Sequence, residues 1–189
     1  MVQLQPQLLT ARDFIDRYGD DARYEAIDGE LIDLEPTGIH EQVAGFIGRK
    51  LNVAIDRQNA SYLIPHRCLV KMLGTETAFR PDVITLGRTR LAQEPLWEKE
   101  PVICRGSSVK LIAEVVSTNW QNDYARKSED YALFGVPEYW IVDYLGLGGR
   151  DYIGSVKQPT LTLCTLDGDR YQKQVLQGSD RLQSPTFPT

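Results

Sequence analysis

The segment from Lys110 to Val116 constrains the fold of this chain more than any other, because beyond its first residue it is apolar apart from one carboxylate. Such near-continuous apolar runs are typical of strands that are buried on both faces. A helix is predicted from Asn122 to Phe134, with Gly135 as its C-cap and Pro137 just beyond. A second buried strand is predicted from Glu138 to Tyr144. The strand, helix and strand succession predicts a right-handed crossover with parallel pairing, and therefore an α/β fold with a mixed (α+β) sheet.

The first half of the chain contains the signals of a hairpin and a long core helix. Two alternating runs flank Asp28-Gly29, and this arrangement is a strong hairpin signal. Apolar residues then recur with helix periodicity from Ile39 to about Arg57. The remaining predictions here are a short helix at Thr10–Tyr18, strands at Ser61–Met72 and Asp82–Leu86, and a loop with one short strand at Gly87–Gly106.

The C-terminal part of the chain is predicted to be an antiparallel β extension. Its three strand-like segments are Tyr152–Val156, Thr160–Leu166 and Arg170–Leu176, and the tail Ser184–Pro188 is predicted to be extended and loosely held. The length suits one compact domain spanning residues 1–189. We expect its core at about residues 23–144 and the β extension at about 150–178.

Composition and charge limit the classes of function. No apolar run approaches the ~20 residues that cross a bilayer, and residues 1–7 have neither a basic start nor an apolar signal segment. We therefore expect a cytoplasmic protein that does not bind membranes. The net charge of −5 weighs against a protein that coats nucleic acid by charge alone. Cys68, Cys104 and Cys164 are dispersed, which favours core residues over a disulfide framework or a zinc site.

Glu114 is the first candidate site residue, because its neighbours on both sides are apolar. A charge buried among apolar side chains is costly unless it is paired or binds a metal. In one interpretation Glu114 lies at the C-terminal end of its strand and forms a salt bridge with an arginine. In the other it is part of a site, since sites in open α/β sheets form at the C-terminal ends of strands.

Asp82 is the second candidate, at the start of the apolar strand that follows Pro81. Proline suits the first position of a strand because it cannot donate to the ladder. A strand-start aspartate can simply be solvated. If Asp82 and Glu114 lie on neighbouring strands, however, their charges repel and a divalent cation resolves the conflict. Mg²⁺ typically binds one or two carboxylates together with waters and phosphate oxygens.

Lys127 is the third candidate, because it shares one helical face with Tyr124, Tyr131 and Phe134. One interpretation is a lysine whose stem packs while its ammonium reaches solvent. The other is a cation aimed at the strand of Glu114, able to stabilise charge that develops on a phosphoryl group. Asp123 could pair with Lys127 or begin the helix, and the structural role is favoured.

The pair of Pro81-Asp82 and Glu114 resembles the PD-(D/E)XK nuclease superfamily. That signature expects a lysine two residues after the glutamate, where this chain has Val116, and Lys127 fits a known variant in which the lysine has migrated to the following helix. Longer stretches resemble a large bacterial family of restriction-endonuclease-like proteins, formerly a domain of unknown function. The matching segments are Tyr24-Glu25-x-x-Asp28-Gly29-Glu30-Leu31, Pro81-Asp82-Val83, Glu114-Val115-Val116-Ser117, Asp123-x-x-x-Lys127-x-x-x-Tyr131 and Gly135–Asp143.

The resemblance implies a restriction-endonuclease-like core with flanking helices, and a metal-dependent endonuclease. It implies Asp82 and Glu114 as metal ligands, with the backbone carbonyl of Val115 or Val116 completing the shell, and Lys127 as the catalytic cation. The implied cofactor is Mg²⁺, with Mn²⁺ as a substitute. The implied partners are nucleic acid, with DNA the expected form, and a second copy in a homodimer. Candidate auxiliary residues from the first elements are Glu25, Glu30 and His40.

Two other functions stay open at this point. A nucleic-acid-binding or assembly module that kept the fold and lost catalysis is favoured by the acidic charge and by Val116 at the lysine position. A two-carboxylate sugar hydrolase would use Glu114 as acid and Asp82 as nucleophile, but it requires carboxyl groups ~5–9.5 Å apart and leaves Lys127 without a role.

Overall fold

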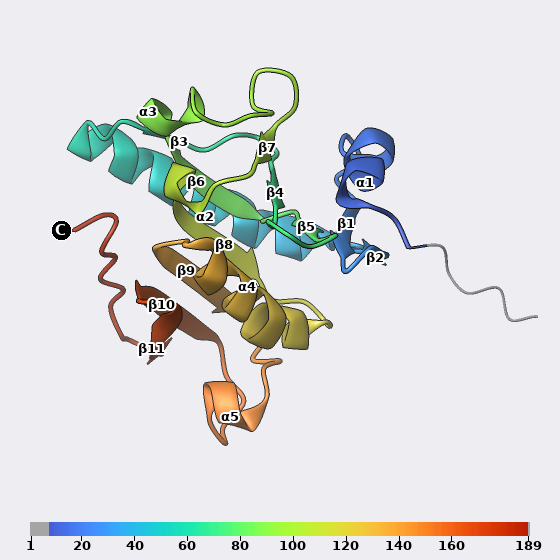
Figure 1. Cartoon of the computed structure of the whole chain (residues 1–189). Coiled ribbons are helices and arrows are strands. Elements are labelled where there is room, and N and C mark those ends of the chain that lie inside the picture. The colour runs from blue at the N-terminus through green and yellow to red at the C-terminus, as the bar shows by residue number, and fades with distance from the viewer. Residues whose placement is uncertain (1–7, 189) are drawn as a thin grey trace, which may run out of the picture.

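The computed structural model describes residues 8–188 and contains two sheets with helices packed around them (Figure 1). The helices are α1 (Ala11–Tyr18), α2 (Gly38–Gln58), α3 (Arg88–Leu91), α4 (Lys127–Phe134), α5 (Arg150–Ile153), the 3-10 turn η1 (Gly106–Ser108) and the π-helical turn η2 (Asn122–Arg126). The strands are β1 (Tyr24–Ile27), β2 (Glu30–Asp33), β3 (Tyr62–Leu63), β4 (Leu69–Lys71), β5 (Ala78–Phe79), β6 (Val83–Gly87), β7 (Val102–Ile103), β8 (Val109–Val115), β9 (Glu138–Asp143), β10 (Thr160–Asp167) and β11 (Arg170–Gln177). Residues 1–7, on which the expectation of no signal segment rests, lie outside the described residues, as does Thr189. No described helix is both long and apolar enough to cross a membrane.

The larger sheet has six strands in the order β11-β10-β9-β8-β6-β3. β8 and β9 run parallel, in a register that pairs Glu114 with Ile141, and η2 and α4 connect them. The other pairings in this sheet are antiparallel. The predicted mixed sheet and its crossover are therefore confirmed. The C-terminal strands are antiparallel as predicted, and β10 extends the same sheet beside β9.

Helices cover both faces of this sheet, and the alternation of side chains along β8 decides which helix each residue meets (Figure 1). Leu111 and Ala113 pack in one cluster with Leu51 of α2. Ile112 packs in another cluster with Tyr131 of α4. Glu114 has the parity of Ile112, so its side chain lies on the α4 side of the sheet.

The smaller sheet has five strands in the order β2-β1-β5-β4-β7. Its β1–β2 hairpin turns at Asp28 and Gly29, where φ is 51° and 83°. A two-residue hairpin with positive φ at both turn positions is the arrangement that Asp-Gly favours. β5 leads through the link at residues 80–82 directly into β6 of the larger sheet. The junction between the two sheets therefore lies at Arg80-Pro81-Asp82.

Three predicted segments differ from the structure. The single strand predicted at Ser61–Met72 is wrong, because a bend separates β3 from β4. The loop predicted at Gly87–Gly106 contains the helix α3 as well as the short strand β7. The strand predicted at Tyr152–Val156 is also wrong, because Tyr152 and Ile153 belong to α5 and residues 154–156 follow it outside any strand. There the ring of Tyr152 packs 4.9 Å from that of Tyr124, centroid to centroid, in place of a strand partner.

The predicted loose tail at Ser184–Pro188 is bound to the larger sheet. Glu138 is 1% exposed, and its carboxylate accepts hydrogen bonds from Thr186 N at 2.8 Å and Ser184 Oγ at 3.0 Å. Phe187 is 7% exposed and packs edge-on against Tyr62. A buried carboxylate requires donors, and the tail supplies them. The prediction failed because a polar sequence does not reveal the distant acceptor.

Replacing Phe187 with alanine tests this attachment. Phe187→Ala should lower the free energy of unfolding by about 3 kcal/mol, the usual scale for a buried aromatic ring, in urea titrations. Val156→Ala is the matched control, since Val156 is 65% exposed and should change stability by less than about 0.5 kcal/mol. Equal stabilities for the two variants would contradict a docked tail.

Candidate active site

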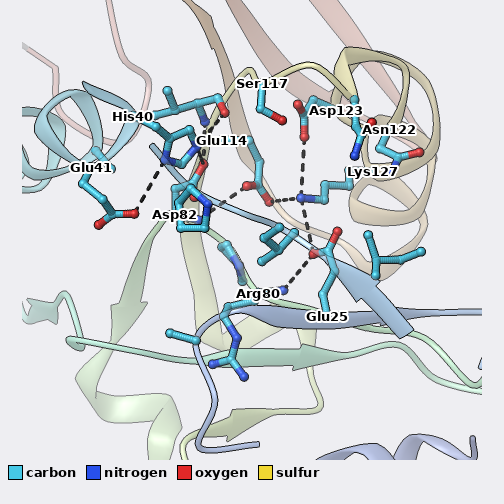
Figure 2. Close-up of a pocket in the computed structure, with 18 of the residues that line it drawn as sticks. Glu25, His40, Glu41, Arg80, Asp82, Glu114, Ser117, Asn122, Asp123 and Lys127 are labelled. Carbon is cyan, nitrogen blue, oxygen red and sulfur yellow. Dashed lines mark hydrogen bonds and ion pairs between the residues drawn. The ribbon is translucent and has the colours of Figure 1, made fainter. Parts of the chain in front are cut away.

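A pocket opens where the two sheets meet, between the start of α2 and the η2–α4 segment (Figure 2). It receives side chains from both sheets, from their link and from both helices. The polar residues that line it are Glu25, His40, Glu41, His66, Arg67, Arg80, Asp82, Glu114, Ser117, Asn119, Asn122, Asp123 and Lys127. Asp82, Glu114 and Lys127, which are far apart in the sequence, therefore meet in one pocket.

Antiparallel pairing of β6 with β8 brings Asp82 beside Glu114. Val83 pairs with Ala113, so the residue before Val83 lies next to the residue after Ala113. Asp82 Oδ2 accepts a hydrogen bond from Val115 N at 2.7 Å, and Glu114 Oε2 accepts one from Asp82 N at 3.4 Å. Each carboxylate is thus held by the backbone of the other strand.

Lys127 is 4% exposed and its ammonium lies inside the pocket. Lys127 Nζ is 3.3 Å from Glu114 Oε1, 3.4 Å from Glu25 Oε2 and 3.5 Å from Asp123 Oδ1. Its stem does not lead the charge to solvent, so the structure favours the inward-facing interpretation of this residue over the solvent-facing one. Tyr131, one helical turn later, donates its hydroxyl to Glu114 Oε1 at 2.8 Å.

The charges around Lys127 do not balance. Five carboxylates (Glu25, Glu41, Asp82, Glu114 and Asp123) line the pocket, against the three permanent positive charges of Arg67, Arg80 and Lys127. Burial raises the pKa of Glu114 well above its ordinary range, against the opposing effect of Lys127. Burial likewise raises the pKa of Asp123 to about 6. Burial opposes the charged form of Lys127, but Glu114, Glu25 and Asp123 outweigh it and hold the pKa of Lys127 well above its ordinary value. Additional protons or a cation would relieve this excess of negative charge.

His40 lies between the first turn of α2 and the end of β8. Its Nε2 is 3.0 Å from Val115 O and 3.4 Å from Asp82 Oδ2. The hydrogen bond to Asp82 raises the pKa of His40, against the opposing effect of burial. Its Nδ1 is buried without a hydrogen bond and lies 3.7 Å from Glu41 Oε1. His40 therefore fixes the carbonyl of Val115, which the resemblance implies as a metal ligand.

The structure separates the two glutamates of the hairpin that were candidate auxiliary residues. Glu25 is 1% exposed, and its Oε2 accepts a hydrogen bond from Arg80 N at 3.2 Å beside Lys127. Glu30 is exposed at the turn end of the hairpin, opposite Ile27, and does not line the pocket. The pocket wall contains Ile32, which is two residues, or ~7 Å, farther along β2. Glu30 is therefore not brought to the site.

Some residues that line the pocket are not among the site residues predicted from the sequence. Asp123 was interpreted as structural, yet it is 7% exposed and faces the ammonium. Asp123 precedes Lys127 by four residues and Tyr131 follows it by four. This spacing is the signal that could have identified Asp123 and Tyr131. Glu41, Asn119 and Asn122 have no such signal, because only the fold brings them to the rim.

The oxygen donors present suit a hard divalent cation. The carboxylates of Asp82 and Glu114 and the carbonyl of Val115 are the donor types that Mg²⁺ prefers, with waters and phosphate oxygens in the other positions. Within residues 8–188, no three side chains of His, Cys, Asp or Glu form a ready-made ligand group. The pocket therefore fits a cation that Asp82, Glu114 and the carbonyl of Val115 would hold, and its excess negative charge favours such an ion.

Comparisons with known proteins agree with this fold. The structure is similar to the crystal structure of a protein from Anabaena variabilis ATCC 29413, described as a putative nuclease belonging to DUF820, with a TM-score of 0.66. The two sequences are 17% identical, and the match covers 95% of this chain and 90% of that chain, so this likeness establishes the fold. No similar sequence was found among curated proteins. The model of the Uma2 family, described as "Putative restriction endonuclease", matches residues 11–189, and the chain belongs to that family.

Proposed function

We propose that this protein is a Mg²⁺-dependent endonuclease that hydrolyses phosphodiester bonds of nucleic acid, with DNA as its substrate. The observation that carries the proposal is the charge imbalance in the pocket. Glu114, Glu25 and Asp123 lie within ion-pair distance of one buried lysine at the junction of two sheets, and Asp82 and Glu41 line the same pocket. A structural ion pair would need only one of these carboxylates. Membership of the Uma2 family supports the same conclusion.

In this proposal Asp82, Glu114 and the carbonyl of Val115 hold the cation. When bound, Mg²⁺ lowers the pKa of a water and polarises the phosphorus–oxygen bond. Lys127 favours the ionised form of Glu114, in opposition to burial, and supplies positive charge where the phosphate arrives. His40 and Tyr131 act as positioning residues, because they hold Val115 O and Glu114 Oε1.

The position of Lys127 also explains why the site does not need a lysine at position 116. Val116 is 1% exposed and packs in the core cluster on the α4 side of the sheet. A lysine there would need a cavity that the core does not offer. The ammonium reaches Glu114 from α4 instead, which weakens the case for a module that has lost catalysis.

Substitutions of the pocket residues test the activity. Asp82→Asn and Lys127→Met should each lower the rate of Mg²⁺-dependent DNA cleavage by at least about 100-fold, the scale for loss of one charge-stabilising group. Glu30→Gln is the matched control and should leave the rate unchanged, because Glu30 does not line the pocket. Thermal unfolding verifies that each variant is folded. Cleavage that survives Asp82→Asn would overturn the assignment.

Metal binding can be tested without activity. Mg²⁺ or Mn²⁺ at about 100 times its Kd should stabilise the protein by ~2.7 kcal/mol, seen as a rise in Tm that a chelator reverses. Asp82→Asn should remove most of this rise. A rise in Tm without cleavage of any DNA or RNA would favour the alternative, a module that binds but does not cleave. An unchanged Tm with either ion would contradict the proposed metal site.

The raised pKa of Asp123 predicts a dependence of stability on pH in the metal-free protein. Between its ordinary pKa of 3.8 and the folded value of about 6, the folded state keeps a proton that the unfolded state has lost. The contribution of Asp123 to stability therefore falls as pH rises through this window. The Asp123→Asn variant has no titratable group at this position. From about pH 4 to about pH 7, the free energy of unfolding of the wild type should therefore fall by up to ~3 kcal/mol relative to that of the variant. Urea titrations with a chelator measure the difference, and a constant difference would refute the shift.

A further inference from the structure

The side of α2 that faces away from the core presents an aromatic ring flanked by two cations. Phe46 is 54% exposed. Arg49 Cζ lies 5.5 Å and Lys50 Nζ lies 5.4 Å from the centroid of its ring. Among the described residues, neither cation has a carboxylate within ion-pair distance. Both positive charges are therefore available to a partner.

Helix geometry separates this side from the core. The buried residues of α2 between Ala44 and Ile55 pack against the larger sheet. Phe46, Arg49 and Lys50 follow the spacing of three and four that places side chains on one face, which is opposite to the buried one. On that face no carboxylate occurs from Ile39 to Val53. A locally positive surface is notable in a chain with a net charge of −5.

This surface lies about 140° around α2 from Glu41, a residue that lines the active-site pocket. His40, Glu41 and Ala44 of α2 line the pocket, and Phe46 lies ~8 Å along the helix axis from Glu41. Gly45 stands between them, and a Cβ added there would meet nothing within 4 Å. A strand with one phosphate in the pocket therefore reaches Phe46 by passing around the exposed side of α2, over Gly45.

We propose that Phe46, Arg49 and Lys50 form a binding surface for an unpaired stretch of the nucleic-acid substrate, beside the phosphodiester that enters the pocket. An unpaired base stacks on the ring of Phe46, and the two cations contact neighbouring phosphates. Stacking on an aromatic side chain needs an accessible base face and tolerates any sequence. The inference rests on the proposed nuclease function and assigns its substrate a single-stranded segment next to the cleavage point.

A second copy of this chain is the other conceivable occupant. Pairing through Phe46 would bring together two cations from each copy, with no carboxylate on the face between Ile39 and Val53 to neutralise them. Phosphates supply the missing negative charge, so the observations favour nucleic acid.

Fluorescence anisotropy with labelled oligonucleotides of about 20 nucleotides, longer than usual single-strand sites, tests the proposal. A chelator prevents cleavage. The single strand should bind at least tenfold more tightly than the duplex. Phe46→Ala and the double variant R49Q/K50Q should each weaken single-strand binding at least tenfold. The double variant should also reduce the slope of log K against log salt by about 1.4. Arg170→Gln is the control for the loss of one exposed positive charge, because Arg170 is 90% exposed on β11.

A Phe46→Trp variant gives a direct signature. It should retain single-strand binding, and its added fluorescence should be quenched when the oligonucleotide binds. Unchanged affinity in Phe46→Ala and R49Q/K50Q, with cleavage still lost in Asp82→Asn, would overturn this inference and leave the proposed function standing. Binding that depends on Phe46 without cleavage of any substrate would overturn the function alone. Sedimentation that shows a dimer broken by Phe46→Ala, with oligonucleotide affinity unchanged, would assign the surface to self-association instead.

Discussion

The ammonium of Lys127, buried among three carboxylates, is the interaction on which the rest of the site depends. Glu114 comes from β8, Glu25 from β1, and Asp123 from the turn before α4. One positive charge therefore links the larger sheet, the smaller sheet and a helix. Buried charges are tolerated only when they are paired, so the three elements must stay in register. The free-energy cost of leaving a buried charge unpaired therefore fixes the geometry of the pocket.

The helix that carries Lys127 begins in an unusual way. Residues 122–126 form a π-helical turn before the α-helix begins at Lys127. Such turns insert an extra residue per turn and occur frequently at functional sites. Here the turn belongs to the segment that presents Asp123, Lys127 and Tyr131 to the strand of Glu114. The local irregularity and these residues of the candidate site therefore belong to the same stretch of backbone.

Much of this arrangement follows from local sequence, and the remainder depends on distant contacts. The apolar run around Glu114, the helix ending at Gly135 and the Asp-Gly hairpin each have a physical signal within a few residues. Asp82 could be matched with Glu114 because both begin or end apolar strands. Glu25 could not be placed beside Lys127, because their contact requires two sheets to meet. Glu30 appears equivalent to Glu25 in sequence but lies at the other end of the hairpin. The prediction of a loose tail at Ser184–Pro188 is wrong because its hydrogen-bond acceptor, Glu138, is remote in sequence.

The smaller sheet has an evolutionary consequence. β1 joins its neighbour β5 through a register that pairs Ala26 with Ala78, and it delivers Glu25 to the pocket, while the larger sheet delivers Asp82 and Glu114. Substitutions at Ile32, which lines the pocket from β2, can therefore alter the rim without disturbing the strands that hold the other two carboxylates. Such a division lets mutation change the rim of the pocket while the paired strands that carry Asp82 and Glu114 stay the same.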